Sequence, residues 1–142
     1  MSKFRGAVFA LVALVCAGCG SGNPWDPVQV SGKITYEDGS VIPVGGMRLY
    51  FMPQTPPVDA KTFPRQGVVG VNIADGTFDK ITTYKHADGL IPGKHKVIVA
   101  ANERGGGGGS AVKIPKEYAS IETTPIVIDT ADSPIHIKIR KP

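Results

Sequence analysis

The C-terminal segment constrains the fold more than any other part of the sequence, because its side chains change character at every residue. Between residues 135 and 140 (IHIKIR), three isoleucines alternate with three basic side chains. A period of two is typical of a half-buried β-strand, in which one face is aliphatic and the other is solvated. No window of twelve residues carries a sustained helical stripe. The chain is therefore predicted to be all-β.

Six further strands are predicted upstream from short runs of β-branched and aromatic residues. They cover residues 28–36, 47–52, 67–73, 77–81, 95–100 and 126–129. Turn residues separate these runs, and Asp75-Gly76 predicts a hairpin. Residues 115–120 (PKEYAS) predict one helical turn with Pro at its first position. Seven short strands with such turns predict an antiparallel β-sandwich over residues 28–142.

The N-terminus has the three-region layout of a secretory signal peptide. Two basic residues precede an apolar run, and small residues close that run directly before Cys19. The apolar residues 7–17 make up about half of the roughly 20 residues that a membrane span needs. A cysteine in this position resembles the signal of a bacterial lipoprotein. The resemblance implies removal of residues 1–18 and attachment of lipid, such as palmitate, to Cys19.

Residues 19–27 are then predicted to be a lipidated N-terminus and a short tether, because they are small, polar and interrupted by proline. Cys16 stands where such signals usually carry an aliphatic residue, and a secreted protein cleaved without lipid is the alternative. Gly20 follows the lipidation site in place of an Asp, which favours the outer membrane over the inner membrane. Trp25 is expected either to pack against the near end of the domain or to contact lipid headgroups.

Charge and cysteine content narrow the class of protein further. The chain has 16 Lys and Arg against 12 Asp and Glu, and loss of Lys3 and Arg5 leaves 14 against 12, a net charge of +2. No basic footprint of a nucleic-acid binder is present, so no nucleic-acid partner is expected. Both cysteines are used by the signal and the anchor, so no disulfide is predicted. The remaining chain of about 115 residues is long enough for one core that buries roughly 65% of the unfolded surface.

Four segments, in order, resemble the carboxypeptidase regulatory-like domains of small bacterial lipoproteins. They are residues 30–39 (VSGKITYEDG), 75–78 (DGTF), 88–97 (DGLIPGKHKV) and 114–125 (IPKEYASIETTP). The resemblance spans roughly residues 28–140 and implies a transthyretin-like or prealbumin-like (Ig-like) sandwich of seven strands. His95 departs from the family, which usually carries Tyr at this position.

No catalytic, cofactor or metal site is predicted from the remaining residues. The close ligand pairs of a zinc site are missing around His86, His95 and His136. Turn and cap roles are assigned to Asp75, Asp79, Asp88 and Asp129. The glycine-rich residues 105–110 lack the Lys-Ser/Thr of a phosphate-binding loop. One enzyme with the transthyretin fold, 5-hydroxyisourate hydrolase, ends in Tyr-Arg-Gly-Ser, whereas this chain ends in IRKP. A cleft shared by His86, His95 and Arg104 would nevertheless favour a hydrolase.

The sequence therefore predicts a non-enzymatic β-sandwich at the cell envelope, held to the membrane by lipid on Cys19. Its role would be structural, adhesive or binding, with an envelope protein or polysaccharide as the partner. A small hydrolase or a diffusible domain that binds a polymer or peptide is the alternative. Residues 54–65 and 105–110 are the expected binding surfaces, chosen because loops on a rigid scaffold are exposed.

Overall fold

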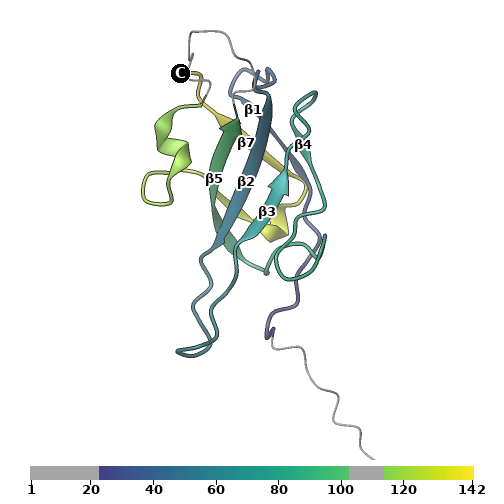
Figure 1. Cartoon of the computed structure of the whole chain (residues 1–142), viewed down its shortest axis with the longest axis vertical. Helices are drawn as coiled ribbons and strands as arrows, with labels where there is room; N and C mark the ends of the chain where they lie inside the picture. The colour runs from purple at the N-terminus through teal and green to yellow at the C-terminus, as the bar shows by residue number, and fades with distance from the viewer. Residues whose placement is uncertain (1–22, 103–113) are drawn as a thin grey trace, which may run out of the picture.

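Strands with alternating burial build two sheets around one core. The computed structural model describes residues 23–102 and 114–142. The first sheet has the strand order β4-β1-β7, formed by Thr77–Phe78, Gly32–Tyr36 and Ile135–Ile139 (Figure 1). The second has the order β3-β2-β5-β6, formed by Gly67–Gly70, Gly46–Pro53, Lys94–Asn102 and Val127–Asp129. The prediction of an all-β chain with seven strands is confirmed for the described residues.

The core lies between the two sheets and takes alternate side chains from β2, β5 and β7, whereas β1 buries three consecutive residues. In β7 the three isoleucines are buried and the basic side chains are exposed, as the alternation predicted. Leu49 in β2 and Val97 in β5 face the same cluster of buried residues from the other sheet. The rings of Phe51 and Phe78 join the sheets, with their centroids 5.9 Å apart. Burial of one such side chain stabilises the fold by about 1.5–3 kcal/mol.

The prediction of a wholly antiparallel sandwich is wrong for one pair of strands. β1 and β7 run parallel, with Gly32 beside Ile135 and Tyr36 beside Ile139. Antiparallel pairing is imposed on strands that a short hairpin joins, whereas strands far apart in sequence can pair in either direction. β7 enters from β6 in the opposite sheet through a short 3-10 helix, η2 (Thr130–Asp132), so no hairpin constrains it.

The predicted hairpin at Asp75-Gly76 is also wrong, although the turn itself forms. Gly76 has a φ of +77° and donates its N–H to the carbonyl of Asn72 at 2.7 Å. The strands on either side belong to different sheets, because β3 pairs with β2 while β4 pairs with β1. The turn is therefore a corner that carries the chain across the sandwich and delivers Phe78 to the core. β4 ends after this residue, and the predicted 77–81 strand is shorter than expected.

The helical turn predicted at residues 115–120 is confirmed as a 3-10 helix, η1 (Lys116–Ala119), which Pro115 precedes. It packs beside β5 and buries Tyr118, whose hydroxyl accepts a hydrogen bond from the backbone N–H of Arg140 at 3.1 Å.

The two ends of the sandwich carry different loops. Pro53 pairs with His95 at one end and Gly46 with Asn102 at the other. The 54–66 loop and the first described residues share the former end, which lies at the bottom of Figure 1.

Candidate functional site

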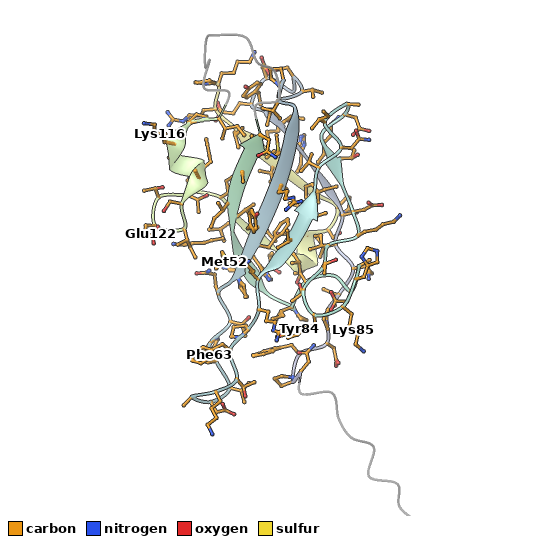
Figure 2. All side chains as sticks on the ribbon, viewed as in Figure 1. Met52, Phe63, Tyr84, Lys85, Lys116 and Glu122 are labelled. Carbon is orange, nitrogen blue, oxygen red and sulfur yellow. The ribbon has the colours of Figure 1, made fainter. Side chains whose placement is uncertain are left out.

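Three segments that lie far apart in the sequence meet at the end of the sandwich where the described chain begins. They are residues 23–27, the 54–66 loop and residues 83–88, and they line an open cleft of about 670 Å³. We call this the tether-end cleft. Its aromatic and basic lining consists of Trp25, Lys61, Phe63, Arg65, Tyr84 and Lys85, and Asp26 and Asp88 also line it. Figure 2 shows Phe63, Tyr84 and Lys85 at this end of the molecule.

The 54–66 loop owes its shape to Asp59. Its carboxylate accepts hydrogen bonds from the backbone N–H groups of Lys61 and Thr62 at 2.7 and 2.8 Å, and from the Thr62 hydroxyl at 3.0 Å. These bonds hold the pKa of the Asp59 carboxyl below its ordinary value. The loop is thus closed on itself while its apolar side chains face outward. Phe63 and Val58 each remain 61% exposed.

Residues 83–88 are held by a second carboxylate in the same way. Asp88 accepts hydrogen bonds from the backbone N–H groups of Thr83, Tyr84 and Lys85 at 2.8, 3.0 and 2.9 Å. Burial raises the pKa of this carboxyl, but the three bonds outweigh that effect, and the pKa lies below its ordinary value. The assignment of the aspartates to turns and caps is confirmed for Asp88. It also holds for Asp75, which accepts from the Thr77 N–H, and for the Asp129 cap of η2.

The chain directly after residues 23–27 is joined to this loop through backbone hydrogen bonds. Val28 and Leu90 exchange two N–H to carbonyl hydrogen bonds, at 2.8 and 2.9 Å. Gly89 adopts a φ of +100°, and a Cβ at this position would lie 2.0 Å from the Val28 carbonyl oxygen. The close approach of the two segments therefore requires glycine at 89. This close contact between Gly89 and Val28 fixes where the chain enters the domain.

Trp25 is half-buried and lines the cleft. Its backbone N–H donates a hydrogen bond to the side-chain oxygen of Asn23 at 3.0 Å. The structure places Trp25 at the near end of the domain, as the first of the two interpretations offered by the sequence expects, and contact with lipid headgroups stays a prediction. The Arg65 guanidinium lies over the Tyr84 ring, 5.2 Å from its centroid. Such cation–π contacts keep an arginine in place without neutralising its charge.

The histidines singled out by the sequence occupy dissimilar environments. His86 and His136 are exposed, whereas His95 has no exposed surface. Arg104, the third member of the proposed hydrolase cluster, lies outside the described residues, as do Cys19 and the 105–110 segment. In residues 23–102 and 114–142 no group of three His, Cys, Asp or Glu side chains is arranged to hold a metal ion.

His95 is the buried polar residue that sequence reasoning did not place. It replaces the expected aromatic in the strand alternation of β5 and points into the core. Its Nδ1 lies 3.2 Å from the Gly93 carbonyl oxygen, and its Nε2 has no hydrogen-bond partner among the described residues. Burial lowers the pKa of this imidazole, against smaller opposing effects of Gly93 and Asp129. The ring is therefore held neutral in the core.

Comparison of the chain with family models, curated proteins and solved structures gives no match. The likeness to carboxypeptidase regulatory-like domains thus rests on the residues quoted above. Within the described ranges, no helix has both the length and the apolar character needed to cross a membrane.

Proposed function

We propose that this chain is a lipid-anchored β-sandwich module of a bacterial cell envelope, with a structural, adhesive or binding role and no catalytic one. The observation that carries the proposal is the position of Cys19. It follows a basic start, a short apolar run and two small residues, and it lies four residues before the first described residue of the domain. An anchor at this position would hold the tether end near a membrane and leave the opposite end for a partner in the envelope.

The finer fold assignment, a transthyretin-like sandwich of the carboxypeptidase regulatory-like kind, belongs to the same proposal. Two of the quoted segments have clear structural roles that support it. Asp88-Gly89 organises the loop that receives the tether. Tyr118, from the 114–125 segment, is buried and bonded to the end of β7. Residues of this kind are expected to recur among chains that share the fold.

Intact-mass analysis of membrane and soluble fractions tests the anchor. The wild type is expected in the membrane fraction, with a mass that begins at Cys19 and includes acyl chains. Cys19→Ala should lose both the acyl mass and the membrane association. Cys16→Leu is the matched control, because it removes the other cysteine and gives this position the aliphatic residue that such signals usually carry. An unlipidated mature wild type in the soluble fraction would contradict the proposal and favour a diffusible binding protein or a hydrolase.

The membrane that receives the anchor is tested separately in a bacterium with two membranes. Gly20 after the lipidated cysteine favours the outer membrane, where a partner could be an envelope protein or polysaccharide. Density fractionation of the wild type and Gly20→Asp should place the first in the outer membrane and move the second to the inner membrane. Inner-membrane residence of the wild type would contradict this part of the proposal.

A further inference from the structure

We propose that the tether-end cleft is a membrane-contact face, which seats the sandwich on the phospholipid headgroup layer of the anchoring membrane. The inference rests on the proposed lipidation of Cys19 and adds to it an orientation and a set of contact residues. Trp25, Phe63 and Val58 would enter the interface, while Lys61, Arg65 and Lys85 would contact lipid phosphates.

Chain length brings this face to the membrane. Asn23 lies four residues after Cys19 and lines the cleft. Four residues reach at most about 14 Å even when fully extended. The polar layer of one leaflet is itself about 5–8 Å thick, from a total bilayer thickness of 40–45 Å and a hydrocarbon core of 30 Å. An anchored domain therefore has little room to stand clear of the headgroups at this end.

Apolar side chains are exposed where that contact would occur. In the described residues the exposed large hydrophobic side chains are Val28, Val58, Phe63, Ile73 and Val127. Val58 and Phe63 belong to the 54–66 loop, Val28 directly follows the tether, and the half-buried Trp25 lines the cleft with Phe63. Tryptophan and tyrosine are favoured at the membrane–water boundary, because their apolar rings carry a polar group that remains hydrated.

Three exposed cations at this end form no ion pair, although the carboxylates of Asp26, Asp59 and Asp88 lie at the same end. Lys61, Arg65 and Lys85 are all exposed, and none forms an ion pair with another described residue. The carboxylates of Asp59 and Asp88 keep their negative charge, accept hydrogen bonds from backbone N–H groups of their own loops, and form no ion pair with these cations. Long basic side chains can extend their charged ends to phosphates while their stems cover apolar surface. Asp26 is the exposed acidic residue of the cleft lining.

Trp25 is the only tryptophan of the chain, so its fluorescence reports this face directly. The lipidated full-length protein is reconstituted in vesicles of phosphatidylethanolamine and phosphatidylglycerol, with and without lipids brominated near the top of the acyl chains. Flotation of the vesicles reports the anchor, and quenching of Trp25 by the brominated lipid reports the contact. We expect the wild type to float and to be quenched.

Two variants remove the contact without touching the core. Phe63→Ser removes the exposed ring, and the double variant Lys61→Glu with Lys85→Glu reverses the charges. Both should still float but lose most of the quenching. Val127→Ser and Lys138→Glu are the matched controls on β6 and β7, where an apolar and a basic side chain are also exposed. These should be quenched like the wild type.

The outcomes separate the two proposals. A wild-type protein that floats with an unquenched Trp25 would overturn the membrane-contact face and leave the anchor intact. Equal loss of quenching in the control variants would also overturn the assignment to this face. A protein that does not float would overturn the anchor and, with it, the orientation inferred here.

Discussion

Two clusters of basic side chains on this molecule look alike in sequence and differ in structure. At the C-terminal end of β7, Arg140 forms an ion pair with Glu117 of η1, and Lys141 forms one with Asp38. The Lys141 ammonium also lies 5.5 Å from the centroid of the Tyr36 ring. These cations brace neighbouring segments of the fold. Two of the three Lys and Arg side chains at the chain end are therefore paired with carboxylates of the fold, and Lys138 forms no ion pair with another described residue.

At the tether-end cleft, Lys61, Arg65 and Lys85 have no acidic partner among the described residues, and aromatic side chains accompany them. The comparison teaches that local charge density in a sequence does not locate a binding surface. A binding surface is better located by basic side chains that form no ion pair. Which side chains these are depends on the carboxylates that the fold brings near them. In the 54–66 loop the Asp59 carboxylate accepts backbone N–H bonds, and Lys61 forms no ion pair with it.

The largest expected effect on the free energy of unfolding comes from a substitution that forces the backbone segments at the cleft end apart. Gly89→Ala should destabilise the domain by about 3 kcal/mol, because the new Cβ meets the Val28 carbonyl at a positive φ. Gly39→Ala is the matched control, since Gly39 has a φ of +85° with no atom within 4 Å of the added Cβ. It should cost only about 1–2 kcal/mol from the left-handed backbone. Urea unfolding curves compare the two; equal losses would contradict the role assigned to Gly89.

A smaller effect concerns the imidazole buried beneath the cleft end. Because burial lowers the pKa of His95 in the folded state, the unfolded chain binds more protons at mildly acidic pH. The free energy of unfolding should therefore be fully maintained above about pH 6.5, the ordinary value for histidine, and fall as the pH drops below it. Urea unfolding across this range measures the slope.

The His95→Gln variant should lower stability at neutral pH and remove this contribution to the slope. His86→Gln, at an exposed site, is the matched control and should leave the slope unchanged. A slope in the His95→Gln protein equal to that of the wild type would show that another group causes the pH dependence.

The smallest expected effect on the free energy of unfolding tests whether the two basic clusters differ in their ion pairs. Arg140→Ala should slightly lower the free energy of unfolding, with a loss that shrinks at high salt, because exposed ion pairs are weak and screened. Lys61→Ala should leave stability unchanged, since this side chain has no ion-pair partner among the described residues. Thermal unfolding at low and high salt compares them. Equal and salt-dependent losses would show that Lys61 also braces the fold.

Much of the architecture follows from local pattern. The alternation in β7 predicted which isoleucines are buried, and Pro115 predicted the start of η1. The parallel pairing of β1 and β7 and the corner at Gly76 could not be predicted in this way. Both depend on which sheet the next strand joins, and that choice is made by packing between distant segments.

The tether-end cleft was only partly predictable for the same reason. Exposure pointed to residues 54–65, and Trp25 was expected either against the near end of the domain or at the lipid headgroups, but neither expectation indicated Tyr84 or Lys85. Those residues reach the cleft because Asp88 folds their loop and Gly89 brings it against Val28. The Asp-Gly pair was the available signal, and the sequence alone could not tell which segment would meet it.

The distance of each end of the sandwich from the membrane tests the account most directly. The sulfur of the lipidated Cys19 is expected to be a thioether, and the mature chain then has no free thiol. Single labels can therefore be attached at Phe63→Cys in the tether-end cleft and at Ile73→Cys beside the opposite end. The labels are nitroxides on the lipidated protein in phospholipid vesicles, and their accessibility to a lipid-soluble relaxing agent is measured. The account predicts high accessibility at position 63 and the accessibility of an aqueous site at position 73. Equal aqueous values at both positions, or the reverse order, would contradict it.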